Sequence, residues 1–228
     1  MTSPRRRDKD ATQREILDAA SELFADKGFA DTSLTDIAKK ADVTKSLIHH
    51  HFGTKEELWK TVAENLFESY RALQRRLIRE GPDSLDTYSN SIRSYFEFLR
   101  ENPRVRRMQS WMTLEDVPRT TKHVELMVEG VEKIRRAQQS GRLRDDVPAQ
   151  FMLMSFLFLV EHWFQSKEMM CHGLPAEMQL QDADQPFLEA IVTILLDGVK
   201  GPLAKAAPAE VSPEPPAEPS DDAPQPAQ

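Results

Sequence analysis

Apolar residues recur along this chain at the spacing of a helix rather than at alternate positions. One face of the segment from Thr12 to Gly28, for example, carries Ile16, Ala19, Ala20, Leu23 and Phe24. No window alternates apolar and polar residues with an excess of β-branched side chains, which is the pattern typical of a strand. The pattern therefore predicts an all-α fold up to about residue 200.

Local signals mark where the helices begin. Capping-box patterns, in which Ser or Thr precedes an acidic residue by three positions, occur at Thr12–Glu15, Ser33–Asp36 and Thr54–Glu57. Prolines at first-turn positions mark four later starts, at Pro103, Pro118, Pro148 and Pro186. These signals predict nine helices, over residues 12–27, 33–40, 44–51, 54–79, 84–100, 103–114, 118–140, 148–170 and 186–199.

Two short predicted helices, separated by a turn at Asp42–Val43, form the most informative pattern. Their inward positions are apolar, namely Leu34, Ile37, Ala38, Val43 and Ile48. The outward positions of the second helix are mostly polar, namely Thr44, Lys45, Ser46, Leu47, His49 and His50. This pattern indicates a helix-turn-helix, whose second helix can enter the major groove of DNA. Lys55 opens the following helix, where the helix dipole disfavours a cation, which suggests an external anion as its partner.

Residues 11–60 resemble the DNA-binding segment of the tetracycline-repressor (TetR) family. The resemblance rests on the run TSLTDIAKKADVTKSLIHHHFGTKEEL, residues 32–58, and on the preceding helix with its Lys27-Gly28-Phe29 end. It implies a homodimeric repressor that binds a palindromic operator in double-stranded DNA. The chain departs from the family pattern at His49, where a tyrosine is usual, and at Asp42, where a turn glycine is usual. Aspartate tolerates left-handed backbone geometry, so we expect the turn to form.

The resemblance also implies site residues. Carried onto this chain position by position, it gives as DNA contacts Ser33, Thr35, Thr44, Lys45, Ser46, Leu47, His49, His50 and Lys55. The implied domains are a basic arm over 1–10, a three-helix DNA-binding head over 11–58 and a ligand-binding and dimerisation body of about six helices over 59–200.

The terminal segments differ in composition from the rest of the chain. The arm carries Arg5-Arg6-Arg7, which can reach a minor groove or remain solvated. The tail over 201–228 holds eight prolines and seven alanines, with a net charge of −4, and is predicted to be disordered. The whole chain has a net charge of −7, but residues 1–60 carry as many basic as acidic side chains. The overall acidity therefore does not exclude DNA binding by the head.

Composition excludes several classes of site. The single cysteine, Cys171, excludes an intrachain disulfide and a thiolate zinc site. The longest apolar run, Phe151 to Val160, is too short to cross a membrane, and no secretory signal follows the N-terminus, so we expect a cytoplasmic protein without a membrane partner. Consecutive histidines 49–51 point about 100° apart on a helix and converge poorly on one metal. No metal, cofactor or catalytic constellation is predicted, so the chain is not expected to be an enzyme.

The last two predicted helices are strongly apolar, and the family resemblance implies that they pair with their copies in a dimer. The residues expected at that interface are Phe156, Val160, Trp163, Phe187, Ile191, Ile194 and Leu195. A small, hydrophobic effector is expected in the body, because methionine and aromatic side chains adapt to apolar ligands. The candidate lining residues are Met108, Trp111, Met112, Met127, Phe158 and His162.

Two alternatives remain open at this stage. The first is a helical small-molecule-binding protein whose head no longer binds DNA, which the departures at Asp42 and His49 favour. The second is a protein-interaction module that uses the Pro-rich tail.

Overall fold

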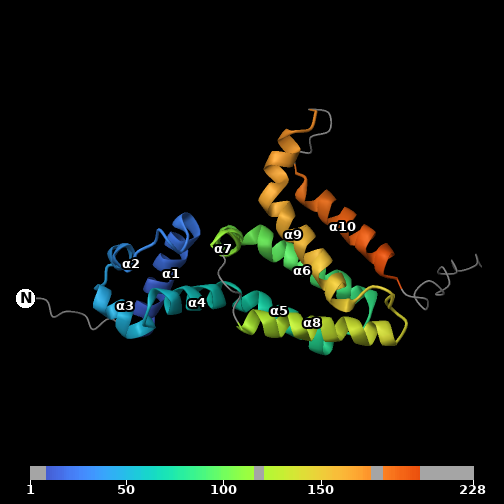
Figure 1. Cartoon of the computed structure of the whole chain (residues 1–228), viewed down its shortest axis with the longest axis horizontal. Helices are drawn as coiled ribbons and strands as arrows, with labels where there is room; N and C mark the ends of the chain where they lie inside the picture. The colour runs from blue at the N-terminus through green and yellow to red at the C-terminus, as the bar shows by residue number, and fades with distance from the viewer. Residues whose placement is uncertain (1–8, 116–120, 176–181, 201–228) are drawn as a thin grey trace, which may run out of the picture.

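The computed structural model describes residues 9–115, 121–175 and 182–200, and these fold into ten α-helices (Figure 1). The helices are α1 (Lys9–Lys27), α2 (Leu34–Lys40), α3 (Lys45–Phe52), α4 (Lys55–Leu66), α5 (Glu68–Glu80), α6 (Leu85–Glu101), α7 (Pro103–Leu114), α8 (Thr121–Gln139), α9 (Ala149–His172) and α10 (Asp184–Val199). This confirms the all-α prediction. Within the described ranges, no helix combines the length and hydropathy that a bilayer span requires. The arginines of the arm, Pro118 and the acidic tail lie outside the described residues.

Two predicted boundaries are wrong. The segment predicted as one long helix, 54–79, is divided at Phe67 into α4 and α5, with Phe67 at φ −97° and ψ 0°. No glycine or proline marks this break; Phe67 is instead buried in the body core, with its ring 5.8 Å from that of Phe98. The capping box at Thr12 is also wrong, because α1 begins at Lys9 and Thr12 is buried within it.

The head consists of α1, α2, α3 and α4, at the left in Figure 1. Its core is aromatic and aliphatic: Phe24 meets Trp59 edge to face at 4.8 Å, and Ile37 and Ile48 are fully buried beside them. The capping boxes Ser33–Asp36 and Thr54–Glu57 both form, as predicted. Asp42 has φ +51°, so aspartate does adopt the left-handed turn geometry expected of it.

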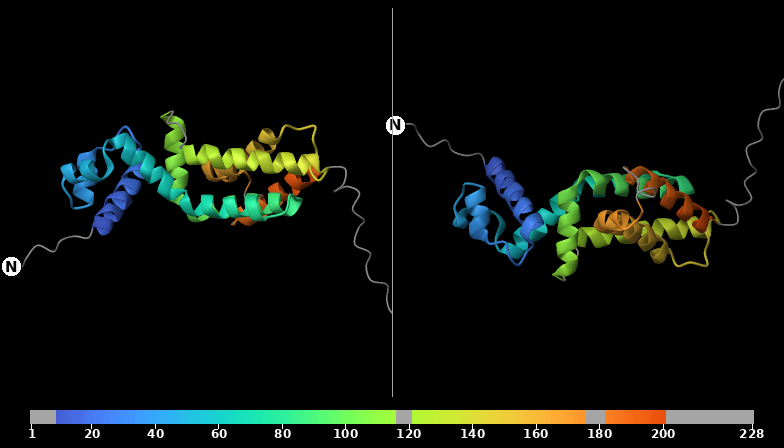
Figure 2. Two further views of the ribbon diagram at one scale, coloured as in Figure 1. Left: turned by 90° about the horizontal axis from the view of Figure 1, so that it is seen from below. Right: turned by 90° about the horizontal axis from the view of Figure 1, so that it is seen from above.

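The body consists of α5, α6, α8, α9 and α10, which extend away from the head (Figures 1 and 2). α8 packs against α5 and α9, while α6 packs against α5, α9 and α10. A second core fills the space between them, built on Ile92, Phe96, Phe156 and Val160. The chain therefore has two cores, one in the head and one in the body.

Helix α7 connects the two cores, since it packs against α1 and α4 on one side and α6 and α9 on the other. Met108 is fully buried in the head core. Polar contacts along α7 also hold α1 and the loop after it. Arg104 pairs with Asp18 at 2.7 Å, Trp111 Nε1 donates to the Ala25 carbonyl at 3.1 Å, and Glu115 accepts from the backbone N–H groups of Phe29 and Ala30 at 3.0 and 3.1 Å. α7 is therefore fixed to the head along its length.

This packing makes Met108 a structural residue of the head. We expect Met108→Ala to lower the free energy of unfolding by about 2–5 kcal/mol, because it removes a fully buried side chain. Urea unfolding followed by circular dichroism measures the change. Leu114→Ala is the matched control, since Leu114 lies on the same helix but is 75% exposed, and its effect should stay within about 0.5 kcal/mol. Equal losses in both variants would contradict the placement of Met108.

Candidate functional site

The outer face of α3 is polar, and one buried residue of the inner face packs in the head core. Ile48 is fully buried, Leu47 is half-buried, and Lys45, Ser46, His49 and His50 are exposed. Thr44 caps the helix by accepting from the Leu47 N–H at 3.3 Å, and its hydroxyl lies 3.0 Å from that of Ser46. Because the inner face is fixed in the head core, the polar outer face has a defined orientation.

The N-terminus of α2 places two further predicted contacts. Ser33 is engaged in the cap: its hydroxyl donates to Asp36 at 2.7 Å, and the Asp36 N–H donates back to it at 3.1 Å. The hydrogen bonds that the Ser33 hydroxyl and the Ser33 backbone N–H donate to the Asp36 carboxyl hold its pKa below the usual value. Thr35, one position into the helix, is exposed. The cap therefore fixes α2, while the Thr35 side chain faces solvent.

Two predicted contacts, Lys55 and His49, have partners within the head. The Lys55 ammonium lies 4.3 Å from the centroid of the Phe29 ring and donates to the Ala30 carbonyl at 3.3 Å. Its position is thus stabilised internally, which the sequence did not indicate. His49 Nδ1 lies 2.9 Å from the Gly53 carbonyl. Lys45 is different, because within the described part of the chain it forms no ion pair.

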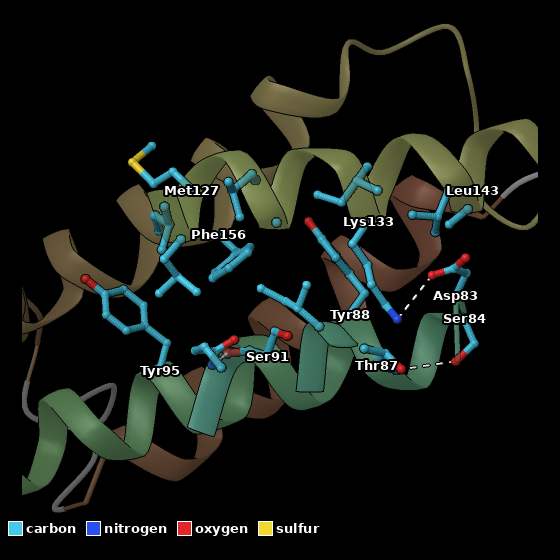
Figure 3. A pocket seen from close by; sticks show the side chains of 18 of the residues that line it. Asp83, Ser84, Thr87, Tyr88, Ser91, Tyr95, Met127, Lys133, Leu143 and Phe156 are labelled. Carbon is cyan, nitrogen blue, oxygen red and sulfur yellow. Dashed lines mark hydrogen bonds and ion pairs between the residues drawn. The ribbon is translucent and has the colours of Figure 1, made fainter. Parts of the chain in front are cut away.

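A cavity in the body lies between α5, α6, α8 and α9 (Figure 3). The cavity volume is about 70 Å³, whereas ~10–15 Å³ suffices for one water. The surface that lines it is mostly apolar, and the apolar side chains are those of Ile78, Leu126, Met127, Ile134, Ala137, Leu143, Leu153, Phe156 and Leu157. The remaining lining residues carry polar groups: Tyr70, Gln74, Asp83, Ser84, Thr87, Tyr88, Ser91, Tyr95, His123 and Lys133, with Gly130 completing the wall. The cavity can therefore take an apolar molecule and orient it by a few polar contacts.

Three tyrosines define the polar character of the cavity wall. Burial raises the pKa of Tyr70, Tyr88 and Tyr95 far above the usual range, so all three phenols stay neutral. The Tyr88 hydroxyl donates to the Met152 carbonyl at 2.9 Å, and the Tyr95 hydroxyl donates to Glu161 at 2.6 Å. Tyr95 therefore connects the cavity wall to a carboxylate on α9.

A hydrogen-bonded trio continues from Tyr95 to α7. Gln109 Nε2 donates to the Tyr95 hydroxyl at 3.0 Å and lies 3.3 Å from Glu161 Oε1. Gln109 is buried and follows Met108 directly. A side chain in the cavity wall is thus bonded to the helix that is fixed to the head.

Most of the predicted ligand contacts require correction. Met127 does line the cavity. Met108, Trp111 and Met112 instead pack in or against the head core. Phe158 is 61% exposed and His162 is exposed, with its Nε2 3.2 Å from the Ser166 hydroxyl. The prediction grouped apolar residues without fixing which face of each helix turns inward, so it missed the tyrosines and Lys133.

The structure places the predicted dimer residues in different environments, and only Ile194 among them is exposed. Phe156, Val160 and Ile191 are at most 5% exposed and belong to the body's own core. Trp163 stacks on Phe187 at 3.9 Å within the chain, and Leu195 is half-buried. Ile194 is 69% exposed.

A different face of α9 is exposed in the part of the chain that the structure describes. Its exposed positions recur at helical spacing: Phe151, Ser155, Phe158, Leu159 and His162. We call these five residues the α9 stripe. The stripe borders the core face, since Leu159 follows the buried Met152 by seven residues, or about two helical turns. Its phenylalanines are among the larger exposed apolar side chains of the described residues.

The histidine run and the acidic side chains form no metal centre in the described residues, where no group of three or more His, Cys, Asp or Glu side chains comes together. The structure therefore brings candidate site residues together in three places, namely the polar face of α3, the body cavity and the α9 stripe.

Comparison with known proteins agrees with this arrangement. The sequence model described as "Bacterial regulatory proteins, tetR family" matches residues 16–62, and the model described as "Tetracyclin repressor-like, C-terminal domain" matches residues 86–192. Together the two matches cover well over half of the chain.

Individual relatives span different parts of the chain. The transcriptional activator FasR of Mycolicibacterium smegmatis is 27% identical over 94 residues, which is 41% of this chain and 43% of FasR. The transcriptional repressor SCO4008 of Streptomyces coelicolor is 26% identical over 162 residues, 69% of this chain and 80% of SCO4008.

A solved structure shares the fold. The crystal structure of the transcriptional regulator SCO4942 from Streptomyces coelicolor superimposes with a TM-score of 0.66 at 23% identity, covering 84% of this chain and 99% of that one. A helix-turn-helix head matched by one family model and a helical body matched by the other show that this protein belongs to the tetR family of bacterial regulatory proteins.

Proposed function

We propose that the protein is a homodimeric transcriptional repressor that binds a palindromic DNA site and leaves it when a small hydrophobic ligand occupies the body cavity. The observation that carries the proposal is the exposed polar face of α3 above the buried Ile48. A capped helix held in this way can enter a major groove with its N-terminal residues nearest the base edges.

The residues proposed to contact DNA are those of the α3 face with their neighbours. Thr44, Lys45, Ser46 and Leu47 lie at the N-terminal end of α3, where base edges are reached. His49 and His50 lie further along the same exposed side, and Ser33, Thr35 and Lys55 flank it and meet phosphates in the proposal. Asp42 keeps the turn in its left-handed geometry, which removes one of the two reasons for suspecting a degenerate head.

The second copy in the proposed dimer covers the α9 stripe. Four of its residues, Phe151, Phe158, Leu159 and His162, are exposed and apolar or aromatic. An apolar face of this kind on a regulator marks an interaction site, and a two-fold arrangement would place two heads on adjacent major grooves, ~34 Å apart. Ile194 of the neighbouring α10 extends the exposed apolar surface.

Release from DNA requires the cavity to communicate with the head. The trio Tyr95–Glu161–Gln109 supplies a contact from the cavity wall to α7, and α7 is fixed to α1 by Arg104, Trp111 and Glu115. A ligand shifts the protein off DNA only if it binds the released conformation more tightly than the bound one. One named relative, FasR, is an activator and another, SCO4008, is a repressor, and repression is our choice because SCO4008 matches 69% of this chain against 41% for FasR.

A regulator of this kind acts on chromosomal DNA, which agrees with the cytoplasmic location expected from the sequence. It binds DNA and ligand without converting either, so no catalytic step is proposed.

The α3 face is tested by removing its unpaired cation. We expect Lys45→Ala to weaken binding to a duplex pool and to reduce the slope of log affinity against log salt by about one unit, because one phosphate contact is lost. Fluorescence anisotropy over a salt series measures both quantities. Lys40→Ala is the control, since Lys40 pairs with Glu22 at 2.7 Å on the far end of α2 and should change the slope little. Unchanged affinity and slope in Lys45→Ala would refute the assignment of this face.

The dimer surface is tested by placing a charge on the α9 stripe. We expect Phe158→Glu to convert the dimer to a monomer at micromolar concentration, because a buried unpaired carboxylate opposes association. Sedimentation equilibrium reports the mass against 26.1 kDa for one chain. Leu114→Glu adds the same charge at a 75% exposed site on α7 and should remain dimeric. A dimer that survives Phe158→Glu would place the interface elsewhere.

A further inference from the structure

One end of the body cavity holds a buried cation. The Lys133 side chain on α8 is only 9% exposed, and its ammonium lies 3.1 Å from Asp83 Oδ1 and donates to the Gly81 carbonyl. Figure 3 shows Lys133 together with Asp83, Ser84 and Thr87 at this end, which we call the Lys133 end. An ammonium has three donors, and two of them meet these partners among the described residues.

The Lys133 end carries more positive than negative charge. Asp83 is shared, because its other carboxylate oxygen lies 3.4 Å from Arg136 Nε. Arg142 also approaches, donating to the Asp83 backbone carbonyl at 3.3 Å. One carboxylate thus faces two paired cations, with a third cation, the Arg142 guanidinium, beside it. The exposed Asp86, in the first turn of α6, is the other nearby acid of that helix.

The burial of Lys133 makes this excess of positive over negative charge energetically important. A buried ammonium is stable only where opposite charge and hydrogen bonds replace its water, and here the single carboxylate is divided between two cations. The N-terminus of the 17-residue α6 opens at the same end, with Ser84 as its cap, and its dipole adds further positive potential. The remaining donor of Lys133, which lines the cavity, is therefore suited to an anion from outside the chain.

The opposite end of the cavity has the reverse character. Tyr95 and Met127 lie there in Figure 3, and the Tyr95 hydroxyl is already bonded to the Glu161 carboxylate at 2.6 Å. Between the two ends the wall is apolar, with Leu126, Ile134 and Phe156. The cavity therefore changes from a cationic end at Lys133, through an apolar wall, to an end formed by Met127 and by Tyr95, whose hydroxyl is already engaged by Glu161.

We propose that the cavity binds an amphipathic anion, an unbranched apolar chain ending in a carboxylate, with its carboxylate on Lys133 and its chain directed towards Tyr95 and Met127. Along α8 the distance from Lys133 to Met127 is ~9 Å, which suits a chain of medium length. This inference rests on the proposed function, in which the cavity is the effector site. It fixes both the chemical class of the effector and its orientation.

The test compares three probes that differ only at the polar end. Decanoate, decanol and decylamine are titrated into the full-length protein by calorimetry, at concentrations where each probe is monomeric. Decanoate is expected to bind about tenfold more tightly than decanol, because a charge-assisted hydrogen bond replaces a neutral one, and decylamine more weakly still. Equal or tighter binding of decanol by the unmodified protein would overturn the proposal without any variant.

A pair of variants then assigns the preference to one side chain. Lys133→Met keeps the length of the side chain and is expected to abolish the preference for decanoate over decanol while binding of decanol persists. Arg135→Met is the control, since Arg135 is 51% exposed on the same helix and pairs with Glu132 outside the cavity. A preference for decanoate that survives Lys133→Met would show Lys133 to be a structural ion-pair residue only.

Failure of this inference can be told apart from failure of the proposed function. DNA binding is measured on the same preparation without any probe. If duplexes bind and decanoate shows no preference over decanol, only the inference on the effector fails. If decanoate binds as expected and no duplex binds, the regulatory function fails and the cavity assignment stands.

Discussion

Two neighbouring residues of α7 belong to different cores, and the rest of the structure depends on that arrangement. Met108 is fully buried in the head core, while Gln109 is bonded to Tyr95 and Glu161 in the body. A helix turns by about 100° from one residue to the next, so a single helix can place consecutive side chains in two separate interiors. Head and body thus share a rigid element, and a displacement of α7 by the body displaces the head with it.

This arrangement connects binding in the cavity to the orientation of the DNA-binding face. Tyr95 lies in the cavity wall, its hydroxyl accepts from Gln109, and α7 holds α1 through Arg104 and Trp111. Contiguous contacts of this kind can couple two sites when the contacts have two alternative arrangements. DNA then favours one arrangement and the cavity ligand favours the other. The buried polar trio suits this role because its hydrogen bonds have directions, so a shift of Tyr95 cannot be absorbed without a shift of α7 or Glu161.

The sequence predicted what depends on local interactions. The caps at Ser33, Thr44 and Thr54 and the left-handed turn at Asp42 are set by residues within four positions, and all four form as predicted. Contacts between distant segments were not predictable in this way. At the break, Phe67 contacts Phe98 of the distant α6, and neither a glycine nor a proline signals the break in the sequence.

The candidate site residues likewise fall into a group that the local sequence predicts and a group that depends on contacts between distant segments. The α3 face follows from the helix-turn-helix pattern, whereas the cavity depends on how α5, α6, α8 and α9 are rotated about their axes. On the nearly all-apolar α9, hydrophobicity alone cannot distinguish the core residue Phe156 from the exposed Phe158. Lys133 could have been singled out only by its position on the inward face of α8, among Leu126, Gly130, Ile134 and Ala137.

The central claim is that a pair of these heads reads a DNA sequence. Selection of duplexes from a random pool by the purified full-length protein, followed by sequencing, tests it most directly. The account predicts enrichment of a palindrome whose two half-sites are centred about one helical turn, ~34 Å, apart. A folded dimer that enriches no sequence would contradict it, and would favour a helical ligand-binding protein whose head no longer reads DNA.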